Sequence, residues 1–154
     1  MEPHKNLESA WWALRIGLGL VAFLAGLDKF FNILTDWSQY VSPFTERLLP
    51  ISVGAFLGIV GVIEMLVGIA VLTAWTRLGA YVAMVWLLGL SVNLLLTGRF
   101  LDIAVRDVAM AIAAYTLARL TEARQPLEET RLSLSAALQT GGRGQSLREP
   151  GWPS

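Results

Sequence analysis

The sequence has no cysteine and only one histidine, His4, among its 154 residues. Without cysteine the chain can form no disulfide, no redox-active thiol and no thiolate metal site. A single histidine near the N-terminus cannot supply both axial ligands of a haem held inside a helical bundle. We therefore expect no metal site and no intrinsic cofactor, and any electron that the protein handles must travel on a borrowed cofactor.

Charged residues are also scarce. They make up 16% of the chain, while hydrophobic residues make up 55% and the mean hydropathy is +0.55. Soluble domains carry about a quarter charged residues, so this composition is typical of a protein that has lipid as its solvent. The formal net charge is zero, which argues against a nucleic-acid-binding surface.

Long apolar segments divide the chain, and each is close to the roughly 20 residues that cross a bilayer as a helix. They cover residues 11–34, 51–74, 78–96 and 100–120. The first is too long for a cleaved signal peptide and carries charge at its end. We expect an all-α, integral membrane four-helix bundle over residues 11–120, after a polar leader at residues 1–10.

Residues 121–154 are predicted to form a tail outside the bilayer. Pro126 precedes leucines at helical spacing, which predicts a short amphipathic helix that lies on the membrane or docks a partner. From Gly141 the composition predicts disorder. Basic residues in the short flanks favour a cytoplasmic location for both termini, and an even number of crossings agrees with it.

The loop of residues 36–50 then lies on the outer side. Trp37, Tyr40 and Phe44 are suited to the membrane interface. Asp36 with Gln39 predicts a capping box for one helical turn, and Ser42 before a proline predicts the start of another. The loop is either a plain interfacial element or a lid over a site.

Small residues form stripes at helical spacing on the first two apolar segments. Gly19, Ala22 and Gly26 share a face with Arg15 and Lys29. On the second segment the stripe consists of Gly54, Gly58, Gly61 and Gly68. Helices in lipid pack closely where residues are small, so we predict that these stripes are the seams of the bundle.

Ionisable residues inside the apolar segments are the candidate functional groups, because a charge in the bilayer is costly and is normally paired and turned inward. The topology gathers most of them in the outer half of the bundle, together with the polar Asn93; they are Asp28, Lys29, Glu64, Arg99, Asp102, Arg106 and Asp107. We expect an Asp102–Arg106 pair, four residues apart, with Lys29 or Arg106 reaching Glu64.

Three interpretations of this cluster stay open. It can be a network that fixes helix register without binding anything. It can bind a quinone headgroup or small polar solute through Lys29, Glu64 and Arg106. It can also be a proton or ion path that uses Glu64. The pattern identifies no catalytic residue.

Two short motifs resemble a known family. Arg15-Ile-Gly-Leu-Gly19 followed by Gly26-Leu-Asp-Lys-Phe30, and Gly61-Val-Ile-Glu-Met-Leu-Val-Gly68, are similar to the corresponding helices of DoxX-like membrane proteins. Thr76-Arg77 at the next turn and Arg106-Asp107 before an alanine-rich stretch also fit, so the resemblance covers residues 14–120.

The resemblance implies a small four-helix protein of a bacterial or archaeal cytoplasmic membrane. By carry-over, Arg15, Lys29, Glu64 and Arg77 match recurrent polar positions of that family. It also implies an accessory subunit of a membrane redox complex that contacts quinone and has a protein partner. The alternatives are a quinone-linked oxidoreductase subunit with its site at the outer cluster, and a small-solute or proton transporter.

Overall fold

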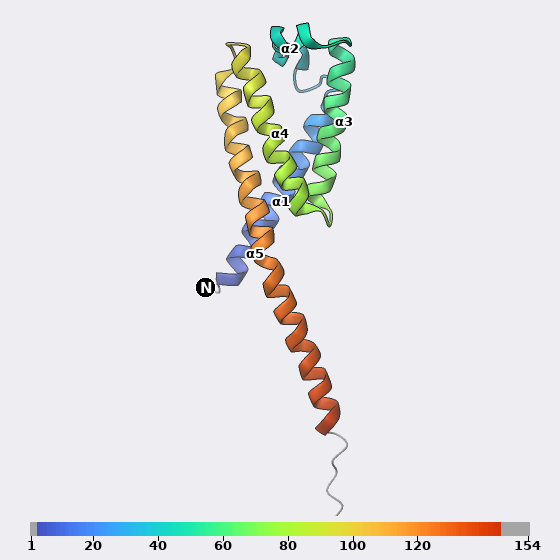
Figure 1. Ribbon diagram of the computed structural model, residues 1–154, viewed down its shortest axis with the longest axis vertical. Coiled ribbons are helices and arrows are strands. Elements are labelled where there is room, and N and C mark those ends of the chain that lie inside the picture. Colours follow the sequence, from blue (N-terminus) through green and yellow to red (C-terminus); the bar gives the residue numbers. More distant parts are fainter. Residues whose placement is uncertain (1–2, 146–154) are drawn as a thin grey trace, which may run out of the picture. The chain divides into compact units, whose positions relative to one another are not determined.

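The computed structural model describes residues 3–145, and all of their regular structure is helical (Figure 1). The elements are α1 (Pro3–Asp28), the 3-10 helix η1 (Trp37–Tyr40), α2 (Pro43–Leu48), α3 (Val53–Leu72), α4 (Thr76–Leu96) and α5 (Leu101–Gln145). The chain forms two compact units, Met1–Thr121 and Glu122–Ser154. We call the end of the first unit that holds residues 29–52 the loop end, and the end at the α3–α4 turn the turn end.

Among the described residues, three helices are long and apolar enough to cross a membrane: Asn6–Asp28, Val53–Leu72 and Thr76–Leu96. Large apolar side chains remain exposed along their outer faces, such as Leu24 at 53%, Leu66 at 60% and Val85 at 63%. In water such surfaces would be costly, whereas lipid solvates them. The chain is therefore an all-α integral membrane protein, as its composition predicts.

The fourth predicted crossing, residues 100–120, forms the first part of α5. This stretch carries Asp102, Arg106, Asp107 and Arg119 and is not among the candidate spans. It nevertheless packs into the bundle through small residues, because Ala104, Ala111, Ala114 and Ala118 are almost completely buried. Four long helices thus share one core, and the crossing by α5 stays a prediction.

Glycines hold α1 and α3 in close antiparallel contact. A Cβ on Gly26 would lie 2.5 Å from the carbonyl oxygen of Gly61, and one on Gly61 would lie 2.6 Å from that of Gly26. Gly68 repeats the arrangement, since its Cβ would lie 2.7 Å from the carbonyl oxygen of Gly19. The prediction of glycine seams is confirmed for these four residues. A Cβ on Gly58 would make only an ordinary contact with Phe30, at 3.8 Å, and one on Gly54 would meet nothing within 4 Å.

The core at the turn end joins all four long helices. Trp11 of α1, Val71 of α3, Ala80 of α4 and Leu117 of α5 belong to one buried cluster. The Trp11 indole Nε1 donates a hydrogen bond of 2.8 Å to the hydroxyl of Thr121. An indole donor needs such a partner when its ring is buried.

Two helix boundaries differ from those predicted. The first apolar segment reads as continuous to Leu34, yet α1 ends at Asp28, whose carboxylate accepts hydrogen bonds from the backbone N–H groups of Ile33 and Leu34. Asn32 adopts a positive φ of 51° in the turn that follows. At the other end of the chain, α5 runs through Pro126 to Gln145, where a new helix was predicted.

In the second unit, the backbone of residues 122–145 is helical. Leu132 and Leu134 are well exposed there, at 68% and 58%. The predicted disordered end from Gly141 has helical backbone as far as Gln145, and its remainder lies outside the described residues.

Candidate functional site at the loop end

A buried ion pair joins α1 to α3. The Lys29 ammonium lies 2.5 Å from Oε2 of Glu64, and the two side chains are only 5% and 8% exposed. Lys29 follows directly after the last residue of α1, while Glu64 lies past the middle of α3. The close approach of the two helices at Gly26 and Gly61 makes this contact possible, because a bulkier seam would separate the two side chains.

Tryptophans surround the pair. The Lys29 ammonium lies 3.7 Å from the ring centroid of Trp37, a cation–π geometry, and it also donates a long hydrogen bond of 3.4 Å to the carbonyl of Ala25. The indole of Trp86, on α4, donates to Oε1 of Glu64 at 3.5 Å. All these partners come from the protein itself, so the ammonium is a fixed positive charge in a desolvated place.

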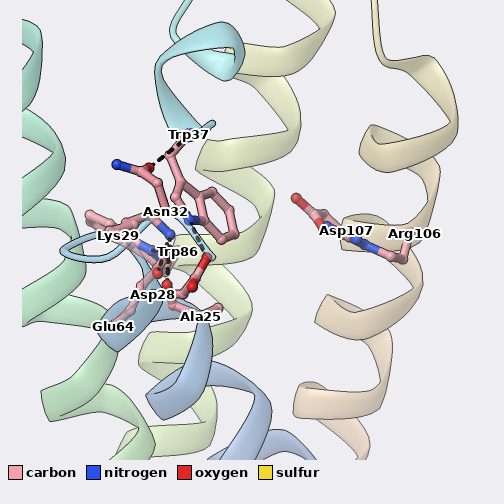
Figure 2. Close-up of polar contacts among 9 residues, drawn as sticks. All are labelled: Ala25, Asp28, Lys29, Asn32, Trp37, Glu64, Trp86, Arg106 and Asp107. Carbon is pink, nitrogen blue, oxygen red and sulfur yellow. Dashed lines mark hydrogen bonds and ion pairs between the residues drawn. The ribbon is translucent and has the colours of Figure 1, made fainter. Parts of the chain in front are cut away.

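Asp28 holds Trp37 over the pair, as Figure 2 shows. Asp28 is 7% exposed, and its carboxylate accepts a hydrogen bond from the Trp37 indole Nε1 at 2.9 Å. The same carboxylate receives the N–H groups of Ile33 and Leu34 at 2.9 to 3.2 Å. Non-helical backbone at membrane depth must be satisfied inside the protein, and Asp28 does this for the segment after α1.

The remainder of the loop is fastened to α4 by Asn93. Its side-chain oxygen accepts from the Ser42 N–H at 3.2 Å and from the Thr45 hydroxyl at 2.8 Å, while its amide donates to the Tyr40 carbonyl at 2.6 Å. Both polar atoms of Asn93 are thus used on backbone and side-chain groups of η1 and α2. The loop is a fixed cover of the bundle end in this structure.

One of the two predicted helix caps in the loop has the predicted hydrogen bonds, and the other differs in part. Ser42 caps α2 by accepting from the Thr45 N–H at 3.0 Å, as predicted. Asp36 caps η1, but it accepts from Ser38, and the Gln39 side chain bonds Thr35 rather than completing a capping box. The hydrogen bonds from Ser38 lower the pKa of Asp36, which is exposed.

On α5, the basic and acidic neighbours Arg106 and Asp107 pair with each other. The guanidinium donates to Oδ1 of Asp107 from Nε at 3.2 Å and from Nη2 at 3.1 Å. The Arg106 side chain is 62% exposed, whereas that of Asp107 is 7% exposed. The predicted partner of Arg106 was Asp102, and this prediction was wrong because Asp102 is exposed. Asp107 lies on the buried face of α5, and the exposed Arg106 pairs with it instead.

The structure therefore brings Lys29 and Glu64 together and leaves Arg106 apart from them (Figure 2). Sequence reasoning missed the role of Trp37 as the cover of the ion pair and that of Trp86 as a donor to Glu64. It also missed Asp107 as the inward carboxylate. Spacing from Ala104 and Ala111, which are buried on the same face of α5, could have identified Asp107.

The turn end holds a second polar constellation, centred on Arg15. Its guanidinium donates to the carbonyls of Val71, Leu72 and Thr73 at 3.2, 2.7 and 2.7 Å, which are the last two carbonyls of α3 and that of its C-cap. It also lies 4.8 Å and 5.1 Å from the ring centroids of Trp11 and Trp12. This arginine satisfies a helix C-terminus and complements its dipole.

This combination of apolar helices, a glycine seam and a buried ion pair defines a small helical membrane protein with polar contacts inside its bundle. The DoxX family model matches residues 10–95, which is more than half of the chain, and the protein belongs to the DoxX family. The match covers Lys29, Glu64 and Arg15 and ends before α5. No curated protein and no solved structure matches the chain.

Proposed function

We propose that this chain is an accessory subunit of a membrane redox complex, and that it contacts a quinone headgroup at the loop end. The observation that carries the proposal is the buried Lys29–Glu64 pair beneath Trp37. A fixed ammonium in a desolvated site favours an electronegative carbonyl oxygen nearby far more than a solvated one does. An indole face beside it suits a flat ring.

The accessory role follows from the chemistry that the sequence offers. The chain has no cysteine, and its one histidine, His4, lies near the N-terminus, so its own residues supply no thiol couple and no paired haem ligands. Electron transfer therefore belongs to a partner, and Leu132 and Leu134 on the second unit offer apolar contact for docking it.

The test is purification from the native membrane in a gentle detergent, followed by mass spectrometry of co-purifying proteins and of extracted quinones. We expect a stoichiometric redox enzyme and bound quinone with the unaltered chain. The double variant Lys29→Met/Glu64→Met removes both charges without leaving one of them unpaired, and we expect it to keep the partner and lose the quinone. The matched control Arg15→Met removes a tryptophan-stacked cation at the other end and should keep both.

Recovery of the chain alone and without quinone contradicts the proposal. Recovery alone with bound quinone and with turnover would favour a quinone-linked oxidoreductase instead. A transport function would appear as solute or proton flux in vesicles that Glu64→Gln abolishes.

The proposal includes cytoplasmic termini and an outer loop end. Because the chain has no cysteine, a single introduced cysteine reports its own side of the membrane. Glu46→Cys on α2 and Ser135→Cys on α5 both place the thiol at an exposed position. We expect a membrane-impermeant maleimide to label Glu46→Cys in intact cells and Ser135→Cys only after lysis. The reverse pattern would overturn the orientation.

A further inference from the structure

Asp107 is a buried carboxylate that is only half used. Its side chain is 7% exposed, and Arg106 bonds only its Oδ1. Within the described residues Oδ2 accepts no hydrogen bond, and it is not among the polar atoms that are completely enclosed. A carboxylate with so little exposure and with one oxygen that lacks a hydrogen-bond partner is uncommon in a folded protein, and such groups usually have a functional reason.

The free oxygen faces the polar cluster. Figure 2 shows the Asp107 carboxylate directed from α5 toward Trp37, with Arg106 on its far side. Asp107 interacts electrostatically with both Lys29 and Glu64. No hydrogen bond or ion pair connects it to either of them in the described part of the chain. The carboxylate thus lies at the same end of the bundle as the Lys29–Glu64 pair but is bonded to neither residue.

An ionised carboxylate can only accept hydrogen bonds. What completes Asp107 must therefore donate one, and the Trp37 indole toward which the carboxylate is directed suits an aromatic ring. We infer that Asp107 Oδ2 accepts a hydrogen bond from the hydroxyl of a lipid-soluble hydroquinone, so that the loop end prefers the reduced quinol to the quinone. This inference rests on the proposed quinone contact and assigns the redox form that the site recognises.

The physical reason for the preference is the asymmetry of the two ligands. A quinol O–H donates a hydrogen bond to Oδ2. A quinone carbonyl oxygen can only accept hydrogen bonds, as Oδ2 does, so a bound quinone leaves this carboxylate oxygen without a partner. A hydrogen bond to a charged group is worth enough to change affinity by about 10- to 100-fold. Arg106 holds Oδ1, so that the carboxylate keeps one orientation and offers the same oxygen to each ligand.

The experiment measures the dissociation constants of a short-chain quinol and of its quinone for the purified full chain, under anaerobic conditions. Quenching of tryptophan fluorescence reports binding, since Trp37 and Trp86 lie at the site. We expect the unaltered protein to bind the quinol about 10- to 100-fold more tightly. Asp107→Asn keeps the shape but can donate as well as accept, and should bring the two constants together. Asp102→Asn changes an exposed carboxylate on the same helix and should keep the preference.

Equal affinities in the unaltered protein, or a preference that survives Asp107→Asn, would overturn the inference while leaving the quinone contact intact. Failure to bind either form would remove both proposals. Should Asp107→Asn not fold, infrared difference spectra of the unaltered protein provide the second test. A carboxylate band that shifts with quinol but not with quinone is expected, and identical spectra with the two ligands would count against the assignment.

Discussion

The two ends of the bundle each place a cation against tryptophan, and they satisfy it by different means. At the turn end Arg15 spreads its charge over three backbone carbonyls and is partly solvated. At the loop end Lys29 is almost completely buried and bonds a full carboxylate, Glu64. The two sites also differ in burial: Lys29 is almost completely enclosed, and a charge in such a place needs a full counter-charge because carbonyl dipoles do not offset the cost of burying it.

The largest expected effect comes from breaking the pair at the loop end. Lys29→Met leaves the Glu64 charge buried and unpaired, and we expect a loss of about 3–5 kcal/mol in the free energy of unfolding. Thermal unfolding in detergent measures it. Removing both charges in Lys29→Met/Glu64→Met should recover most of the loss. A single variant that melts like the unaltered protein would show that the pair contributes nothing.

The glycine seam provides the second comparison between the ends. At Gly26 a Cβ would meet backbone atoms of Gly61 and Met65 at 2.5 and 2.8 Å, whereas at Gly19 the nearest atoms belong to the flexible side chain of Leu72, at 2.5 and 2.7 Å. We expect Gly26→Ala to destabilise by about 1–3 kcal/mol and Gly19→Ala by less. Equal melting temperatures of the two variants would mean that the helices slide apart freely.

A smaller effect is expected at the turn end. Arg15→Met removes hydrogen bonds from the last carbonyls of α3 and the stacking on Trp11 and Trp12. The Arg15 side chain is only partly buried, so we expect a loss of only about 1–2 kcal/mol. Arg15→Lys, which keeps the charge but loses the fork of donors, should fall in between. A loss as large as that of Lys29→Met would refute the distinction drawn from burial.

The smallest effect concerns pH at the exposed cap of η1. The Ser38 hydrogen bonds depress the pKa of Asp36, so the stabilisation is complete above the ordinary pKa of an aspartate and is lost as the pH falls through the lower, folded value. We expect Asp36→Asn to melt slightly below the unaltered protein at neutral pH. The gap should close in acid. A gap that is independent of pH would assign the difference to packing.

Much of the membrane fold could be predicted because lipid imposes simple rules on composition and spacing. The glycine seams and the meeting of Lys29 with Glu64 follow from small-residue stripes and from the cost of an unpaired charge. The end of α1 could not be predicted from hydropathy. Four of residues 30–34 are large and apolar, and the helix ends where the Asp28 carboxylate accepts the backbone N–H groups of Ile33 and Leu34.

For the candidate site, the sequence predicted which helices contribute polar residues but not which side chains pair with each other. Four-residue spacing pointed to Asp102 for Arg106, but the long arginine side chain can reach several acceptors, and Asp107 is the one on the inner face. The cover by Trp37 depends on a loop conformation, with Asn32 at a positive φ of 51°, which no periodic pattern encodes. Loop geometry and side-chain direction, rather than topology, were the missing information.

The clamp at Asn93 has a consequence for biosynthesis. Asn93 donates to the carbonyl of Tyr40, 53 residues earlier in the chain. At ribosomal rates of about 5–20 residues per second, Tyr40 emerges roughly 3–10 s before its partner. Lys29 likewise precedes Glu64 by 35 residues. The sequence separation therefore sets a delay, during which the loop stays unfastened until α3 and then α4 have been synthesised.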